Sequence, residues 1–120
     1  MYCRLAKDHV RFRISQEEFA TLLAGREIEE HVGLPGHKEL VLTVRSTTGL
    51  AAFSCFEDEW FFDIPRDVLV HSQNHETHKE PICTCLLDID RARLLKVDLE
   101  VDVFKRPQPV EFGHITAHIE

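Results

Sequence analysis

Apolar residues recur at every second position in several short segments of this chain, separated by turn-forming residues, and this pattern limits what the chain can fold into. The clearest segment runs from Leu94 to Phe104, where apolar and charged residues alternate. Because successive side chains of a β-strand point to opposite faces, the alternation predicts a strand with one apolar and one polar face. Further apolar runs separated by turn signals predict strands over residues 40–45, 50–56, 60–64 and 82–89.

The first quarter of the chain predicts a hairpin followed by a helix. Residues 3–14 alternate on either side of a short polar turn, as in a β-hairpin. Ser15 then has a glutamate, Glu18, three positions later, which is the spacing of a capping box at a helix N-terminus. Gly25 stands where a helix could end in the left-handed conformation. We therefore expect a helix that starts after Ser15 and stops before Gly25.

The remaining signals complete an α+β prediction. A second short helix is expected from near Pro65 to about His75, and residues 114–119 are expected to form a final edge strand. About eight strands with two short helices and short connections favour a mainly antiparallel curved sheet or a partly closed barrel. No internal repeat is visible in the sequence. A length of 120 residues predicts a single globular domain over residues 1–120, with 105–120 as an extended tail plus edge strand.

The charge and composition of the chain indicate which kinds of partner and which cellular location to expect. The formal net charge is −7 at pH 7, so broad electrostatic attraction to nucleic acid or to an anionic membrane is not expected. The first residues lack the pattern of a secretory signal, and no apolar stretch is long enough to cross a bilayer, which predicts a cytoplasmic protein. The four cysteines are then expected to be reduced thiols, buried or bound to metal.

A weak resemblance covers residues 1–104. The opening Arg11-Phe12-Arg13-Ile14-Ser15-Gln16-Glu17-Glu18, the later Asp63-Ile64-Pro65 and the acidic strand ending at Phe104 resemble a small bacterial domain family of unknown function. That family more often has Leu at the positions of Phe12 and Ile14, and a lysine where this chain has Val101. The resemblance implies a bacterial source and the order hairpin, helix, sheet. It implies no activity, cofactor or catalytic residue.

One segment is rich in soft-metal ligands. Between positions 71 and 85 lie three histidines and two cysteines, and helical spacing places the first two histidines on one face. A zinc or copper site that joins the second helix to the following strand is one interpretation; buried packing is the other, because the spacing matches no recognised zinc motif. The candidate ligands are His71, His75, His78, Cys83 and Cys85.

Two charged groups are further candidates. Arg4, Arg11 and Arg13 are expected to share the outer face of the first hairpin, where they could bind a phosphate or an acidic partner, or pair with nearby carboxylates. Asp98, Glu100 and Asp102 share the polar face of the last long strand. They could hold a hard cation, but alternation of this kind is also typical of a face in contact with solvent, which is the interpretation we favour.

The sequence contains none of the motifs that mark common enzyme classes. It has no phosphate-binding loop, no Gly-x-Ser-x-Gly elbow and no glycine-rich dinucleotide turn. The pattern therefore favours a small binding domain without catalytic activity, whose partner is another protein or a second copy of itself through an exposed edge strand. A metal-binding protein, catalytic or sensory, is the alternative.

Overall fold

The computed structural model describes residues 1–73 and 80–102, and these residues form an α+β fold with eight strands and two helices. The elements of the first half are β1 (Tyr2–Ala6), β2 (His9–Ile14), α1 (Gln16–Leu23), β3 (Ile28–Leu34) and β4 (Lys38–Thr47). Those of the second half are β5 (Ala52–Phe56), β6 (Glu59–Pro65), α2 (Arg66–Gln73), β7 (Cys83–Asp90) and β8 (Arg93–Val101).

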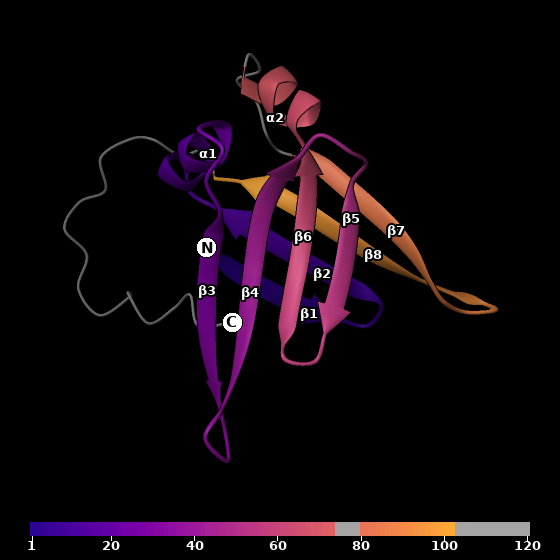
Figure 1. Cartoon of the computed structure of the whole chain (residues 1–120). Coiled ribbons are helices and arrows are strands. Elements are labelled where there is room, and N and C mark those ends of the chain that lie inside the picture. The colour runs from indigo at the N-terminus through magenta and orange to yellow at the C-terminus, as the bar shows by residue number, and fades with distance from the viewer. Residues whose placement is uncertain (74–79, 103–120) are drawn as a thin grey trace.

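The strands form two separate sheets in place of the single curved sheet or partly closed barrel that the sequence predicts. The first sheet has the order β1-β2-β8-β7 and the second has the order β3-β4-β6-β5. Each sheet joins two antiparallel hairpins through a parallel central pair, β2 with β8 and β4 with β6. The two sheets face each other, and both helices lie at the same end of this sandwich (Figure 1). The first sheet combines hairpins from the two ends of the described chain, β1-β2 and β7-β8, and the second combines the consecutive hairpins β3-β4 and β5-β6.

The structure contains a repeat that the sequence does not reveal. The order of two strands, a helix and two strands occurs twice, and the strand registers match between the two units. Tyr2 pairs with Arg13 in the first unit, and Ala52 pairs with Asp63 in the second, fifty positions later. The hairpins that follow the helices also share a register. Ile28 pairs with Val44 in the first unit and Cys83 pairs with Leu99 in the second, so both partners are shifted along the chain by the same number of positions. Each sheet therefore takes one hairpin from each unit.

The core lies between the sheets and beneath the helices. Phe12 and Phe62 hold equivalent positions in the two units and meet at the centre, with ring centroids 5.4 Å apart. Leu22 and Leu69 bring the helices onto this core, and both are completely buried. Among the residues that the structure describes, the other buried apolar ones are Val10, Ile14, Phe19, Ile28, Leu42, Val44, Phe53, Ile64, Cys83, Val97, Leu99 and Val101.

Several local predictions are confirmed. The capping box of α1 is present: the Glu18 backbone N–H donates to Ser15 Oγ at 3.1 Å, and the Ser15 N–H donates to Glu18 Oε1 at 2.8 Å. Gly25 follows the helix with φ +86°, in the left-handed region that favours glycine. The helix predicted near Pro65 begins at Arg66.

Two regions differ from the sequence predictions or lie outside the described residues. β3 was not predicted, because Gly33 and Pro35 indicate a loop; pairing with β4 nevertheless extends the strand to Leu34 before the chain turns. The tail over residues 105–120, with its proposed edge strand, lies outside the described residues. Neither of the two helices in the described part of the chain is long and apolar enough to span a membrane.

Candidate functional site

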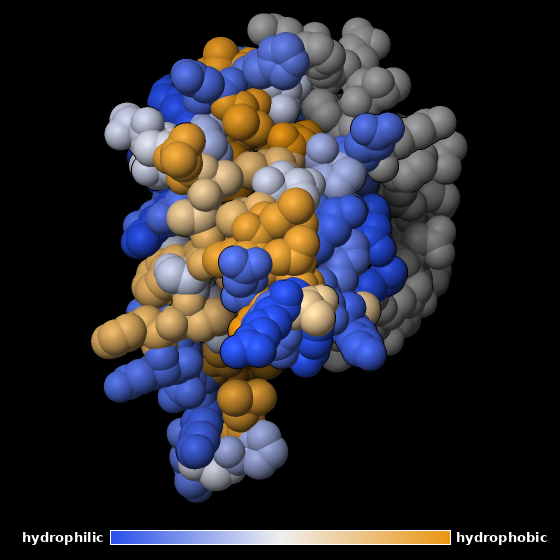
Figure 2. All heavy atoms as spheres, turned by 90° about the vertical axis from the view of Figure 1, so that its right-hand side faces the viewer, coloured by the Kyte–Doolittle hydropathy of each residue, from blue (hydrophilic) through white to orange (hydrophobic). Residues whose placement is uncertain are grey.

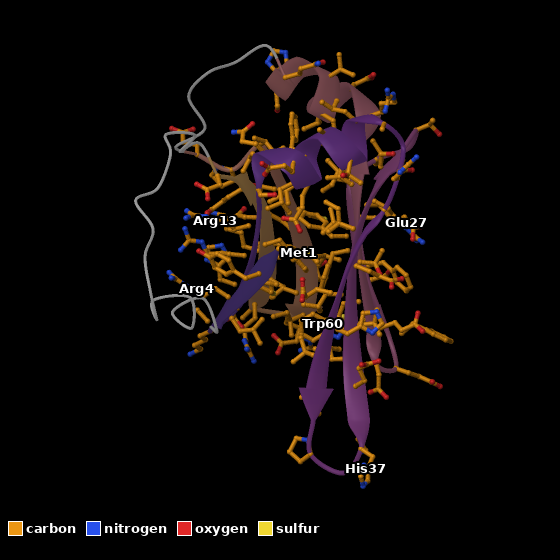
Figure 3. All side chains as sticks on the ribbon, turned by 90° about the vertical axis from the view of Figure 1, so that its left-hand side faces the viewer. Met1, Arg4, Arg13, Glu27, His37 and Trp60 are labelled. Carbon is orange, nitrogen blue, oxygen red and sulfur yellow. The ribbon has the colours of Figure 1, made fainter. Side chains whose placement is uncertain are left out.

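The sandwich has an open side between β1 of the first sheet and β3 of the second, and an apolar cleft lies there. The cleft has a volume of about 250 Å³. Trp60 lies between the two sheets, as seen when looking into this open side (Figure 3). Strands of both sheets supply the walls, which are formed by Cys3, Arg4, Leu5, Val32, Leu40, Leu42 and Trp60. With one exception these side chains are apolar or aromatic, so the cleft suits an apolar group.

Equivalent residues of the two repeated units differ in size beside this cleft. Cys3 pairs with Phe12 in the first unit, and the equivalent residue of the second unit, Phe53, pairs with Phe62. The Phe53 ring is buried and lies 5.9 Å from the Trp60 ring, 6.1 Å from Phe62 and 6.2 Å from Phe12, between ring centroids. Cysteine is too small to fill the same volume, so the first unit leaves space where the second unit has an aromatic ring.

The opposite side of the sandwich is closed. There β5 lies against β7, and the Cys85 thiol donates to the Ala51 carbonyl oxygen at 3.9 Å. Apolar side chains gather on the surface over this side, bordered by hydrophilic ones (Figure 2). Large exposed apolar residues of the β5 and β7 strands include Phe56, Leu86 and Ile89. The same architecture thus brings one pair of edge strands together and keeps the other pair apart.

The rim of the cleft exposes apolar surface to solvent. Leu5 on β1 is 61% exposed and Val32 on β3 is 38% exposed, although both border the cleft. Cys3 lies deeper, and burial raises the pKa of its thiol to about 11, so the thiol is neutral at physiological pH. A neutral thiol behaves as a small apolar group, so Cys3 adds no charge to the cleft.

The outer face of β1 and β2 carries the predicted arginine group, and the structure brings its members together. Arg4, Arg11 and Arg13 surround a small polar pocket of about 60 Å³ together with Tyr2 and Glu100. Register explains the grouping: Arg4 lies opposite Arg11 across the hairpin, and Arg13 lies beside Glu100 across the parallel pair. We call the pocket formed by these five residues the arginine pocket.

Glu100 is the anion at the centre of the arginine pocket. Its Oε2 accepts from Arg11 Nε at 3.1 Å and from Arg11 Nη2 at 2.8 Å, and its Oε1 accepts from Arg13 Nη2 at 3.0 Å. Burial alone would raise the pKa of this carboxyl, but the hydrogen bonds from the two arginines outweigh burial and lower it. Glu100 is therefore ionised at neutral pH, and the guanidinium groups of Arg11 and Arg13 share this one carboxylate.

The acidic face of β8 is not the solvent-exposed face that the sequence suggests. Asp98 and Glu100 are only 2% and 7% exposed. Asp98 Oδ2 lies 2.7 Å from His9 Nε2, and its Oδ1 accepts from the Thr84 hydroxyl at 2.7 Å. Both carboxylates are thus occupied by partners from β2 and β7, which corrects the solvated-face interpretation. The sequence could not show this, because the partners are distant along the chain.

The structure describes three of the five proposed metal ligands, while His75 and His78 lie outside the described residues. His71 is exposed on α2, and Cys83 and Cys85 pack against the core from β7. Burial raises the pKa of the Cys83 thiol to about 11, which opposes formation of the thiolate that binds soft metals. Within residues 1–73 and 80–102, no three His, Cys, Asp or Glu side chains are grouped so as to hold a metal ion. The zinc or copper site stays a prediction.

Comparison with known proteins adds no relative. No protein-family model, no curated protein and no solved structure matches the chain. The grouping of the three arginines on one face was predicted from the sequence, but the presence of Tyr2 and Glu100 in their pocket and the apolar cleft were not. Trp60 and Leu5 look like ordinary core or strand residues in the sequence, and only the meeting of two sheets places them around one space.

Proposed function

We propose that this protein is a small binding domain that takes apolar side chains of a protein partner into the cleft between β1 and β3. The observation that carries the proposal is the unfilled space beside Cys3, in the position where the equivalent Phe53 completes the core on the closed side. Apolar surface at a rim, such as that of Leu5, is costly to leave in water and favours a partner that covers it.

Two features support a protein partner in particular. Edge strands flank the cleft on both sides, β1 in one sheet and β3 in the other, within the described residues. Such edges carry backbone N–H and C=O groups that can pair with another chain. A wall that includes a tryptophan and a charged rim residue, Arg4, is also typical of protein contact surfaces, in which Trp and Arg are enriched.

The test uses Trp60, the single tryptophan of the chain, as an internal reporter. The full chain is titrated with the dye anilinonaphthalene sulfonate, and energy transfer from Trp60 to the bound dye is measured. We expect saturable binding of one dye per chain and strong transfer, because Trp60 lines the cleft. Absence of saturable binding would refute the proposal.

A matched pair of variants locates the binding. Leu5→Asp places a charge at the rim of the cleft, whereas Leu86→Asp changes the same residue type at almost the same exposure, 61% against 62%, on the far edge of the same sheet. We expect Leu5→Asp to abolish dye binding and Leu86→Asp to leave it unchanged. Cys3→Phe provides a second variant, since a ring at this position should fill the cleft. Equal effects of the two leucine variants would contradict a site in the cleft.

A further inference from the structure

The chain leaves its last described strand close to the strand that borders the cleft. β8 ends at the end of the sandwich where α1 lies (Figure 1). Asp102 follows it: its backbone N–H donates to the Ile14 carbonyl oxygen at 2.8 Å, and its carbonyl oxygen accepts from Gln16 Nε2 at 2.6 Å. Asp102 also lines a hollow together with Tyr2, the first residue of β1. Residues 103–120 lie outside the described residues; we call them the tail, and it starts beside β1.

The repeat indicates where a segment that follows β8 would lead. β4 and β8 hold equivalent positions in the two units. In the second sheet the chain passes from the end of β4, across the neighbouring β6, to the start of the edge strand β5. The equivalent path in the first sheet leads from β8 across β2 to β1. Because β1 already fills that position, the path continues to the free edge of β1, which borders the cleft.

The tail has the reach and the side chains to enter the cleft. An extended chain advances about 3.3 Å per residue, so residues 103–109 can span roughly 20 Å, more than the length of the five-residue strand β1. Val110 and Phe112 come next in the sequence. Since alternate side chains of an extended segment share one face, both can point to the same side and present a continuous apolar surface to the cleft.

We infer that the tail is the resting occupant of the cleft, with the ring of Phe112 beside Cys3 and with Val110 next to it, and that a partner binds by displacing the tail. The inference rests on the proposed function and adds the regulation of its site. Phe53 supplies the precedent, because its buried ring completes the core at the position equivalent to Cys3. The apolar rim would thereby leave water without the loss of translational freedom that a separate molecule incurs.

The tether makes the tail a competitor of the partner. A short linker holds a segment near its site at an effective concentration in the millimolar range, whatever the concentration of the protein. A partner must therefore bind more strongly than the tail, or act on the tail, before the cleft opens. Such competition lowers the apparent affinity of a ligand by the fraction of molecules whose cleft is free.

The experiment measures how fast the Cys3 thiol is alkylated in the full chain. Cys3 lines the cleft, whereas Cys83 is buried on β7 and does not line it, so the Cys83 rate reports any general loosening of the fold. N-ethylmaleimide labelling is read by mass spectrometry of digested protein, as the ratio of the Cys3 rate to the Cys83 rate. We expect Phe112→Asp to raise this ratio at least about fivefold, the change for a site covered about four-fifths of the time. An unchanged ratio would overturn the inference.

Two further variants guard against an indirect effect. Phe104→Asp is the matched control, because it introduces the same change at the start of the tail, and it should alter the ratio by less than about twofold. Phe112→Ala removes the ring without adding a charge and should raise the ratio as Phe112→Asp does. Equal effects of Phe104→Asp and Phe112→Asp would refute the placement of Phe112. Protection of Cys3 that falls on dilution would assign the covering segment to a second copy and would also overturn the inference.

Dye titration separates this inference from the proposed function. Phe112→Asp should bind anilinonaphthalene sulfonate at least about fivefold more tightly than the wild type, because its cleft is free. If both chains bind the dye equally and the thiol ratio is unchanged, the apolar site stands and the tail inference is wrong. If the ratio rises but neither chain binds the dye saturably, the tail covers the cleft and the proposed binding function fails. If the ratio is unchanged and no dye binds, both fail.

Discussion

Replacement of Glu100 by glutamine tests whether the arginine pocket is held together by charge. Glu100 is 7% exposed and accepts three hydrogen bonds from Arg11 and Arg13, between 2.8 and 3.1 Å long. Glutamine keeps the size and one acceptor but removes the negative charge. Loss of one member of a buried ion pair typically costs about 3–5 kcal/mol of unfolding free energy.

The expected cost is smaller in this protein because the two cations keep contact with water. The side chains of Arg11 and Arg13 are 38% and 44% exposed, so solvent hydrates them when the carboxylate is lost. We therefore expect Glu100→Gln to lower the unfolding free energy by about 2 kcal/mol at neutral pH. Urea unfolding followed by Trp60 fluorescence measures the difference, with the exposed Glu59→Gln as the control that should change it by less than about 0.5 kcal/mol.

The contribution of Glu100 to the unfolding free energy should also depend on pH, in a direction that follows from its pKa. Burial raises the pKa of Glu100, but the hydrogen bonds from Arg11 and Arg13 outweigh burial, so its net pKa in the folded state is lowered. A lowered folded-state pKa stabilises the fold above the unfolded-state value of about 4.3, and this contribution is lost as pH falls through the folded-state value. The gap between wild type and Glu100→Gln should thus narrow in acid. A gap that is absent at neutral pH, or one that persists unchanged to about pH 2, would refute the reasoning.

Three further predictions concern other parts of the fold. Ser15→Ala removes the N-cap of α1 and should cost about 1 kcal/mol of unfolding free energy, measured by urea unfolding; an unchanged midpoint would show that the capping box contributes nothing. Iodoacetamide should alkylate the exposed Cys55 at least about tenfold faster than the buried Cys83, as read by mass spectrometry of digested protein, and equal rates would contradict the burial of Cys83. Zinc and copper in untagged purified protein should stay well below one ion per chain, because burial holds the Cys83 thiol in its neutral form; stoichiometric metal would instead establish the His and Cys site.

Local chemistry in the sequence determined the elements. The capping box of Ser15 and Glu18 depends on residues three positions apart, and the stop at Gly25 depends on its own backbone freedom, so both could be predicted. Alternation likewise predicted β8, because the apolar face of a strand is visible in its own residues. β3 was missed because its identity as a strand depends on pairing with β4 rather than on its own pattern.

Only the tertiary structure decided which strands lie side by side. Their arrangement in turn decided which residues form the candidate site. Alternation says which residues share a face but not which strand lies beside them, so the sequence suggested one antiparallel sheet where two sheets with parallel centres form. The ion pair of Arg11 with Glu100 joins residues 89 positions apart, and the cleft joins β1 to β6 across two sheets. Such contacts arise from the packing of whole elements. For the same reason nothing in the sequence indicated that Cys3 lines a cleft. The structure shows this, because it places Cys3 at the position equivalent to that of Phe53.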